Sequence, residues 1–314
     1  MIENFEENYN DALILRDWLV FRDANLLYKG KVRLNIGKWK DGRKKRLLVI
    51  LKDLFDLNMA NARPQLEQIY TDLLPGLMDK SYTLIKNSVL SSVFLKDNLI
   101  VKAFPKIIRN NNQIREDVIS RNLYNKGFNV PERFEPFETE FYTCYPMEKL
   151  PFTLVDLLES KGSGCINFVY KIIKTAIPIL KVLHTEFKSL YVDFSIANLA
   201  LKNDIVYMLD FGSMHPTNFS ATPMAKTLRY CSVDAFNGNP VNEWDDLQSL
   251  GFVLLEAYFG FEKSPLNETP SEKSKLDVID NAEKGIYGKF FQEYFQIACT
   301  MDCDNYQNIL DLCI

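Results

Sequence analysis

One stretch of the chain, residues 191–212, constrains the fold more than any other. It reads YVDFSIANLALKNDIVYMLDFG, with Asp193 and Asn198 on either side of a short turn. Two apolar runs follow, separated by Lys-Asn-Asp, which is typical of a turn. The pattern predicts a β-hairpin with strands at residues 199–201 and 205–209, ending at Asp210-Phe211-Gly212.

The predicted hairpin brings three oxygen-bearing side chains to neighbouring loops. Asp193 and Asn198 precede it, and Asp210 follows its second strand. Two carboxylates and an amide form the kind of oxygen-rich site that suits a hard cation such as Mg²⁺. The alternative interpretation is a surface hairpin whose Asp and Asn side chains only cap turns.

The order Asp-x-x-x-x-Asn, hairpin, Asp-Phe-Gly resembles the catalytic loop and metal-binding motif of protein kinases. The resemblance implies that Asp193 orients a hydroxyl nucleophile, that Asn198 and Asp210 hold Mg²⁺, and that ATP supplies the phosphoryl group. It also implies an α+β, bilobal, protein-kinase-like fold, with a small β-rich lobe and a larger helical lobe.

The segment after a short loop narrows the resemblance to one branch of these kinases. Residues 226–251, KTLRYCSVDAFNGNPVNEWDDLQSLG, resemble the casein-kinase-one and vaccinia-related kinase branch, which has Thr-x-Arg-Tyr-x-Ser in place of Ala-Pro-Glu. In that frame a helix begins at Asp245-Asp246-Leu247, and Asp246 is the buried carboxylate that holds the catalytic-loop backbone. Residues 290–312 resemble the closing helices of the same branch. The resemblance covers about residues 82–314 and is strongest over 183–260. The matching residues are Thr227, Arg229, Tyr230 and Ser232.

Short strands before residue 150 are typical of a kinase small lobe. They are expected at residues 82–85, 92–95, 98–103 and 141–147. Lys102, near the end of the third, resembles the kinase lysine that binds the ATP phosphates. Its expected partner is Glu116, on a helix over residues 113–124, with Asp117 as the second choice. The alternative is a surface charge network that includes the neighbouring arginines.

The strand at residues 141–147 leads into Glu148-Lys149-Leu150, which looks like the kinase hinge. The resemblance implies that adenine pairs with backbone groups of Glu148 and Leu150, and that Met147 lies at the back of the nucleotide pocket. Helices of the larger lobe are then expected over residues 153–159 and 168–184, the latter with a broad apolar face and Pro178 inside it.

Two features depart from the kinase pattern. The nucleotide-covering loop should be rich in glycine, but its positions hold Lys86, Ser88 and Ser91. In the catalytic loop, Val192 replaces an Arg that would pair with a phosphorylated segment. Ser195 stands where a Lys usually neutralises the transferring phosphoryl group, and it is the third catalytic candidate beside Asp193 and Lys102.

The chain divides by pattern into an N-terminal extension (residues 1–80), a small lobe (81–150) and a large lobe (151–314). In the extension, residues 32–36 and 47–51 read as strands, and 66–77 as a helix, which makes it an α/β segment. The basic turn at residues 38–46 could contact nucleic acid or an acidic partner, or be a solvated loop.

Composition narrows the function classes. A net charge of −4 predicts no general attraction to nucleic acid or membranes. No apolar run approaches the ~18 residues that a membrane span needs. Six cysteines without a C-x-x-C pair are expected to be free thiols in a reducing compartment. We therefore expect an intracellular protein, cytoplasmic or nuclear, and in the host cell if the source is viral.

Two function hypotheses from different classes follow. The first is a divergent Ser/Thr protein kinase that transfers the ATP γ-phosphate to a hydroxyl of a protein substrate, with ATP and Mg²⁺ as cofactors. The second is a pseudokinase, a binding, scaffold or regulatory module for protein partners with weak or no phosphotransfer. A kinase for small molecules ranks third, because residues 227–251 resemble a protein-kinase large lobe.

Overall fold

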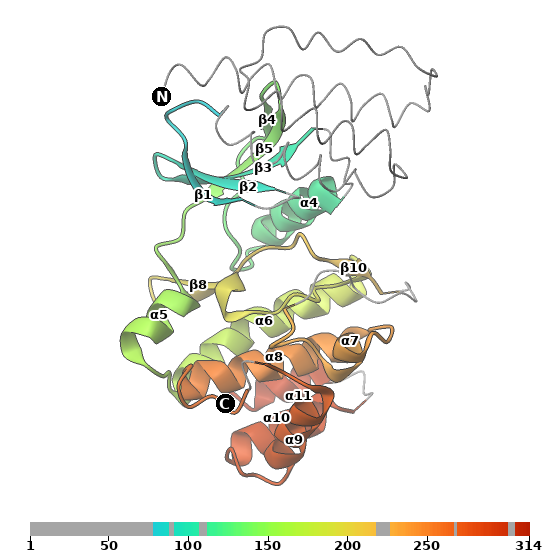
Figure 1. Cartoon of the computed structure of the whole chain (residues 1–314). Helices are drawn as coiled ribbons and strands as arrows, with labels where there is room; N and C mark the ends of the chain where they lie inside the picture. Colours follow the sequence, from blue (N-terminus) through green and yellow to red (C-terminus); the bar gives the residue numbers. More distant parts are fainter. Residues whose placement is uncertain (1–77, 88–90, 107–111, 218–226, 267–268, 301–304) are drawn as a thin grey trace, which may run out of the picture. The chain divides into compact units, whose positions relative to one another are not determined.

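The computed structural model describes residues 78–87, 91–106, 112–217, 227–266, 269–300 and 305–314 (Figure 1). These residues fall into two compact units. The first contains residues 78–87, 91–106 and 134–148, and the second contains residues 112–133 and those described from 149 onward. The strands, helix and basic turn expected within residues 1–77 lie outside the described residues, and so does Ser88.

The first unit is built on one antiparallel sheet with the strand order β1-β2-β3-β5-β4. The four predicted strands are confirmed, with ends shifted by one or two residues. Because β1 continues past its predicted end, Lys86 pairs with Val93 in the ladder instead of lying in the turn. The strands are β1 (Thr83–Asn87), β2 (Ser92–Lys96), β3 (Leu99–Pro105), β4 (Phe137–Glu138) and β5 (Tyr142–Glu148).

One face of this sheet carries an aromatic cluster. Phe94 of β2 is buried, and the rings of Tyr82 and Tyr142 meet it edge-on at centroid distances of 6.2 and 6.1 Å. Edge-to-face packing of this kind adds to the burial of apolar area. At the β1–β2 turn, the Ser92 hydroxyl donates to Asn87 Oδ1 at 2.7 Å, which ties the two strands together.

The second unit is mainly helical, with two small sheets. The helix predicted over residues 113–124 is α4, those at 153–159 and 168–184 are α5 and α6, and α8, α10 and α11 lie in the segments expected to be helical. Sequence patterns did not predict α7 and α9. The bounds are α4 (Asn112–Asn125), α5 (Leu154–Lys161), α6 (Ile166–Thr185), α7 (Val233–Asn237), α8 (Glu243–Phe259), α9 (Glu272–Glu283), α10 (Lys289–Ala298) and α11 (Asn305–Asp311).

The predicted hairpin is confirmed as β8 (Leu199–Lys202) and β9 (Ile205–Met208), which pair antiparallel with each other. The edge strand β6 (Phe152–Thr153) pairs antiparallel with β8. A short 3-10 helix, η5 (Ile196–Asn198), precedes β8. A second, two-stranded ribbon joins β7 (Ser189–Leu190) to β10 (His215–Pro216). These elements place both ends of the hairpin next to the segments that carry the candidate site residues.

Helix α6 is the central element of the second unit's core. Its apolar face is buried along its whole length, as the sequence pattern predicts, and Pro178 lies inside the helix. Helix α8 packs beside it, and α10 packs on α8 (Figure 1). Thr153 begins α5 with a capping box to Asp156, and Asn242 begins α8 with a capping box to Asp245. Such caps define where each helix starts.

The contact between α8 and α10 depends on Gly251. A Cβ placed on Gly251 would lie 2.8 Å from ring carbons of both Tyr294 and Phe295, and both rings are fully buried. Heavy atoms do not approach so closely, so a side chain at this position must displace packed rings. Glycine is therefore required here for close packing rather than for backbone freedom.

We expect Gly251→Ala to destabilise the protein by about 1–3 kcal/mol, the usual cost of overpacking a core. Urea denaturation measures the change. In the Gly251→Ala background, Phe295→Leu should cost less than it does alone, because it removes one of the clashing ring atoms. Additive costs of the two substitutions would contradict this account of the α8–α10 contact.

Candidate active site

Hydrogen bonds at the open end of the hairpin bring the three oxygen-bearing residues of the sequence motif near one another. The Asn198 amide group donates from Nδ2 to the carbonyl of Asp193 at 2.9 Å. At the other end of the hairpin, the N–H of Leu209 donates to the carbonyl of Asn198 at 2.8 Å. Asp210 follows directly, so the backbone brings Asp193, Asn198 and Asp210 into one neighbourhood.

Tyr191 forms the buried floor of this neighbourhood. Its hydroxyl donates to the carbonyl of Leu209, and its ring packs on Phe194 and Phe211 at 4.6 and 5.5 Å. Burial raises the pKa of Tyr191 well above its ordinary value, and the nearby charges of Asp210 and Asp193 raise it further. The phenol is therefore a neutral hydrogen-bond donor that links the catalytic-loop segment to the end of β9.

The carboxylates of Asp193 and Asp210 differ in their surroundings. Asp193 is half-buried, and its Oδ1 accepts a hydrogen bond from the Thr227 hydroxyl at 2.7 Å. Asp210 is exposed and has a left-handed backbone with φ of 50°; its Oδ1 accepts from the N–H of Gly212 at 3.2 Å. Asp193 is thus bonded to a neighbouring segment, whereas Asp210 is a solvent-exposed residue.

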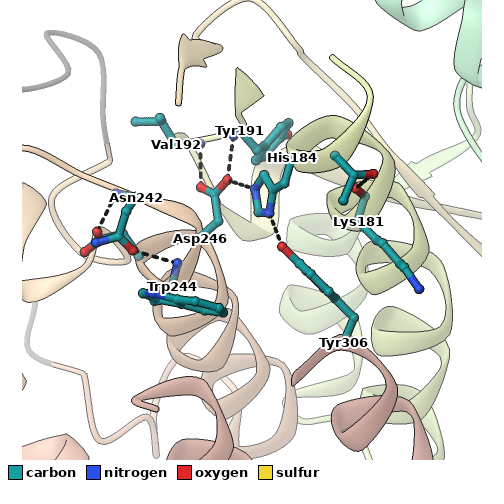
Figure 2. A network of polar contacts seen from close by, with 10 residues as sticks. Lys181, His184, Tyr191, Val192, Asn242, Trp244, Asp246 and Tyr306 are labelled. Atoms are coloured by element: carbon teal, nitrogen blue, oxygen red, sulfur yellow. Dashed lines mark hydrogen bonds and ion pairs between the residues drawn. The ribbon is translucent and has the colours of Figure 1, made fainter. Parts of the chain in front are cut away.

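Asp246, on α8, holds the backbone of this loop from below (Figure 2). Its Oδ2 accepts from the N–H of Tyr191 at 2.6 Å, and its Oδ1 accepts from the N–H of Val192 at 2.8 Å. The role predicted for Asp246 is confirmed. Val192 has φ of 70°, a left-handed conformation that costs a β-branched residue on the order of 1–3 kcal/mol. The two charge-assisted bonds offset that strain.

A histidine that the sequence argument left without a role completes this network. His184 Nε2 lies 2.8 Å from Asp246 Oδ2, and His184 Nδ1 lies 2.6 Å from the hydroxyl of Tyr306 (Figure 2). When Tyr306 donates to Nδ1 and Nε2–H donates to the Asp246 carboxylate, both ring nitrogens of His184 have a hydrogen-bond partner. The one available signal was that His184 falls on the apolar face of α6.

The segment of residues 227–232, here called the Thr227 segment, is held by buried charge. The Arg229 Nε donates to both oxygens of Glu256 at 3.1 and 3.0 Å, and the Tyr230 hydroxyl also donates to Glu256. Glu256 lies in α8 and is fully buried. Such a bidentate pair in a buried setting fixes orientation strongly. Thr227, which contacts Asp193, therefore belongs to a segment that is anchored to α8.

The expected partner helix places Glu116 in a buried ion pair. Glu116 on α4 is 2% exposed, so the surface-network interpretation is wrong for this residue. One oxygen accepts from Arg133 Nη2 at 3.0 Å, a partner that the sequence argument missed. Asp117 pairs instead with Arg121, four residues on, at 2.8 Å.

The remaining predicted site residues lie mostly in the first unit. Lys102 is half-buried on β3, with its ammonium 5.6 Å from the ring centroid of Phe104. Met147 and Glu148 end β5, where they pair with Ile100 and Leu99. Ser91 is half-buried immediately before β2, and Leu150 is half-buried in the second unit.

Ser195 has a local structural role in the second unit. Its hydroxyl oxygen accepts a hydrogen bond from the N–H of Ala197 at 3.1 Å and so begins η5. This bond shapes the turn between Asp193 and Asn198. A seryl hydroxyl used in this way supplies no positive charge, in contrast to the lysine expected there from the kinase pattern.

The site's donor set limits which cation it can hold. Among the described residues, no group of three or more His, Cys, Asp or Glu side chains could hold a metal ion by itself. Asn198 and Asp210 offer one amide and one carboxylate oxygen, both hard donors. Mg²⁺ is commonly bound by one or two such groups together with phosphate oxygens and water. The residues therefore fit Mg²⁺ that arrives with a phosphate ligand.

Five of the six cysteines lie in described parts of the chain, and all five are free thiols, in agreement with the sequence. Burial raises the pKa of Cys144 to about 12 and that of Cys313 to about 11, so both thiols are protonated and unreactive near neutral pH. Within the described residues, no helix is long and apolar enough to cross a bilayer.

Asp246→Asn should destabilise the protein by about 2–3 kcal/mol, because the amide offers one acceptor oxygen to two buried backbone donors. Urea denaturation at pH 7 measures this cost. Asp234→Asn is the matched control: Asp234 is an exposed aspartate in α7 and should change stability by less than ~0.5 kcal/mol. Equal effects of the two substitutions would show that Asp246 does not hold the loop.

Asp245, the neighbour of Asp246, makes stability depend on pH. Burial raises its pKa from 3.8 to about 6, and the charges of Asp234 and Asp246 act in the same direction. The hydrogen bonds from Ser232 and Asn242 oppose this shift. The raised pKa means that the folded protein binds the carboxyl proton of Asp245 more tightly than the unfolded chain does. The contribution of Asp245 to stability therefore falls as pH rises from about 4 to about 6.

Asp245→Asn, which cannot titrate, should therefore become more favourable relative to the wild type as pH rises. Thermal melts of both proteins between pH 4 and pH 7 give the comparison. We expect the Tm difference, variant minus wild type, to increase up to about pH 6 and then to level off. A difference that stays flat or decreases over this range would contradict the raised pKa.

No family model matches the chain. Among curated proteins, it is 28% identical to a probable serine/threonine-protein kinase of fowlpox virus (strain NVSL) over 139 residues, 38% of this chain and 46% of that protein. It is also 28% identical to homeodomain-interacting protein kinase 1 of Caenorhabditis elegans over 194 residues, 57% of this chain and 22% of that protein. The chain thus spans less than half the length of each of these relatives. Both matches support a relationship to the protein kinase superfamily, and the mixed α/β structure fits a kinase-like fold.

Proposed function

We propose that the chain is a divergent Ser/Thr protein kinase that transfers the γ-phosphate of ATP to a hydroxyl group of a protein. The observation that supports this most is that Asn198 bonds Asp193 and that Leu209, the residue before Asp210, bonds both Asn198 and Tyr191. The kinase relatives support the same class of reaction. The likeness of residues 227–251 to the casein-kinase-one and vaccinia-related branch belongs to this proposal as well.

Asp193 has the surroundings of a residue that orients a hydroxyl nucleophile. Its carboxylate already accepts a hydrogen bond from a hydroxyl, that of Thr227. A substrate serine or threonine would donate to the same carboxylate, attack the γ-phosphorus, and release ADP as the bond to the bridging oxygen breaks. The hydroxyl proton passes to Asp193, which serves as the base.

Asn198 and Asp210 are the proposed Mg²⁺ ligands. Because Nδ2 of Asn198 donates to the Asp193 carbonyl, the carbonyl end of the amide is the one available to a cation. Asp210 is exposed, as a ligand to an incoming metal–nucleotide complex must be. When bound, Mg²⁺ would neutralise negative charge on the phosphates.

The other proposed roles follow from the kinase resemblance alone. Lys102 would contact the phosphates, with Glu116 as the carboxylate that orients it. The adenine and covering-loop positions are Met147, Glu148, Leu150, Ser88 and Ser91. ATP and Mg²⁺ are accordingly the proposed cofactors, and a protein is the proposed substrate.

Ser195 motivates a second candidate function, a pseudokinase that binds partners without phosphotransfer. Its hydroxyl begins η5, and the chain has no lysine at this position to stabilise the transferring phosphoryl group. Loss of one such electrostatic donor costs on the order of 10²-fold or more in rate. A slow kinase is therefore the main proposal, and an inactive scaffold is the alternative.

We expect Asp193→Asn to lower phosphate transfer from labelled ATP to dephosphorylated casein by ~10²–10⁴-fold, the usual contribution of a general base. The matched control is Asp204→Asn, an exposed aspartate in the turn of the same hairpin, which should transfer phosphate like the wild type. Transfer that persists unchanged in Asp193→Asn would rule out the proposed reaction.

Thermal melts of the same preparations separate the two candidates. ATP with Mg²⁺ should raise the Tm of the wild type and of Asp193→Asn alike, because a ligand that binds only the folded state stabilises it. No shift in either protein, together with no phosphate transfer, would favour the nucleotide-free scaffold. A shift without transfer would favour a pseudokinase that binds ATP.

A further inference from the structure

Helix α9 contains a lysine that is almost completely buried. Lys275 is 2% exposed, whereas Lys273, Leu276 and Asp277 around it face solvent. The Lys275 ammonium donates to the carbonyl of Cys231 at 2.7 Å and to the carbonyl of Arg229 at 3.1 Å. It also lies 4.7 Å from the ring centroid of Phe252 in α8.

Burial of an ammonium group is costly unless donors and charge are well satisfied. An apolar side chain at position 275 would fill the same space without that cost, while leaving two carbonyls of the Thr227 segment without this donor. Lys275 supplies donors to both and rests against an aromatic face, an arrangement that favours a cation. We therefore infer that Lys275 stabilises the backbone of the Thr227 segment, which it contacts.

The Thr227 segment is held from two sides. Side chains of Arg229 and Tyr230 bind Glu256 of α8, while the carbonyls of Arg229 and Cys231 accept from Lys275 of α9. The segment folds back on itself, because the N–H groups of Tyr230 and Cys231 both donate to the carbonyl of Thr227, at 3.0 and 2.9 Å. Movement of this backbone would move Thr227 directly.

Thr227 is the residue of the segment that reaches the candidate active site, where its hydroxyl contacts Asp193 at 2.7 Å. The path from α9 to Asp193 thus has three steps: Lys275 fixes the backbone at Arg229 and Cys231, this backbone fixes Thr227, and the Thr227 hydroxyl binds Asp193. Each step is a hydrogen bond between described residues of the second unit.

We propose that Lys275 is a positioning residue for the phosphate-accepting side of the site. It holds the Thr227 segment so that the Thr227 hydroxyl keeps Asp193 oriented toward an acceptor hydroxyl. This role of Lys275 rests on the phosphotransfer proposed above. Lys275 binds the Thr227 segment and packs on Phe252 of α8, so its effect is expected on the protein substrate and on catalysis, and not on ATP.

The test compares Lys275→Met with Lys275→Arg and with Lys273→Met in the 314-residue chain. Methionine keeps the length and apolar stem of the side chain but cannot donate, and arginine keeps donors and charge. Lys273→Met removes an exposed lysine from the same helix. Steady-state phosphorylation of dephosphorylated casein gives kcat and the KM values for casein and for ATP.

We expect Lys275→Met to lower kcat/KM for casein by about tenfold or more, the rate equivalent of one charge-assisted hydrogen bond. The KM for ATP should stay unchanged, Lys275→Arg should recover part of the activity, and Lys273→Met should behave as the wild type. If kcat/KM for ATP falls as much as kcat/KM for casein because both KM values rise, or if Lys275→Met has wild-type kinetics, the proposal is overturned.

Hydrogen exchange followed by mass spectrometry tests the positioning independently of activity. In Lys275→Met, peptides that cover residues 227–232 should exchange faster, because the amides of Tyr230 and Cys231 lose protection, while the hairpin at residues 199–209 should not change. Unchanged exchange in residues 227–232 would overturn the proposal even if activity falls. If the wild type transfers no phosphate, the proposed function fails, and exchange alone then decides whether Lys275 holds the segment.

Discussion

The structure of the candidate site depends on one carboxylate, that of Asp246, which binds two consecutive backbone N–H groups. These belong to Tyr191 and Val192, and Val192 is held in a left-handed conformation that its β-branched side chain disfavours. A loop with such a conformation persists only where its surroundings impose it. The buried chain from Tyr306 through His184 to Asp246 provides these surroundings and links three separate helices to the loop.

Hydrogen bonds connect this loop to the proposed catalytic and metal-binding residues. The Tyr191 hydroxyl donates to the carbonyl of Leu209, so the turn before the hairpin is joined to the end of β9. Asn198 bonds Asp193 before the hairpin, and it also bonds Leu209, the residue that precedes Asp210, after the hairpin. A second set of buried charges, Glu256 and Lys275, holds the segment that carries Thr227. The site is thus supported by polar contacts made deep in the helical unit.

Local pattern was sufficient for the hairpin, for the apolar face of α6 and for the helix that carries Glu116, because each of these is set by the spacing of neighbouring residues. It also identified Asp246 through its place in a resemblance. It did not identify Arg133 as the partner of Glu116, the role of His184, or the burial of Lys275. Each of these depends on residues far apart in the chain, and a charged residue in an amphipathic segment is ordinarily expected to face solvent.

The sequence by itself determined which chemical groups are available and in what order: two aspartates and an asparagine around a short hairpin, and no lysine at position 195. Only the tertiary structure decided which of these groups meet. Hydrogen bonds and ion pairs between distant segments form where packing brings their partners together, and packing is a property of the whole unit, so no local pattern contains it. For that reason the ion pair of Glu116 with Arg133, the contacts of His184 and the burial of Lys275 became evident only in the fold.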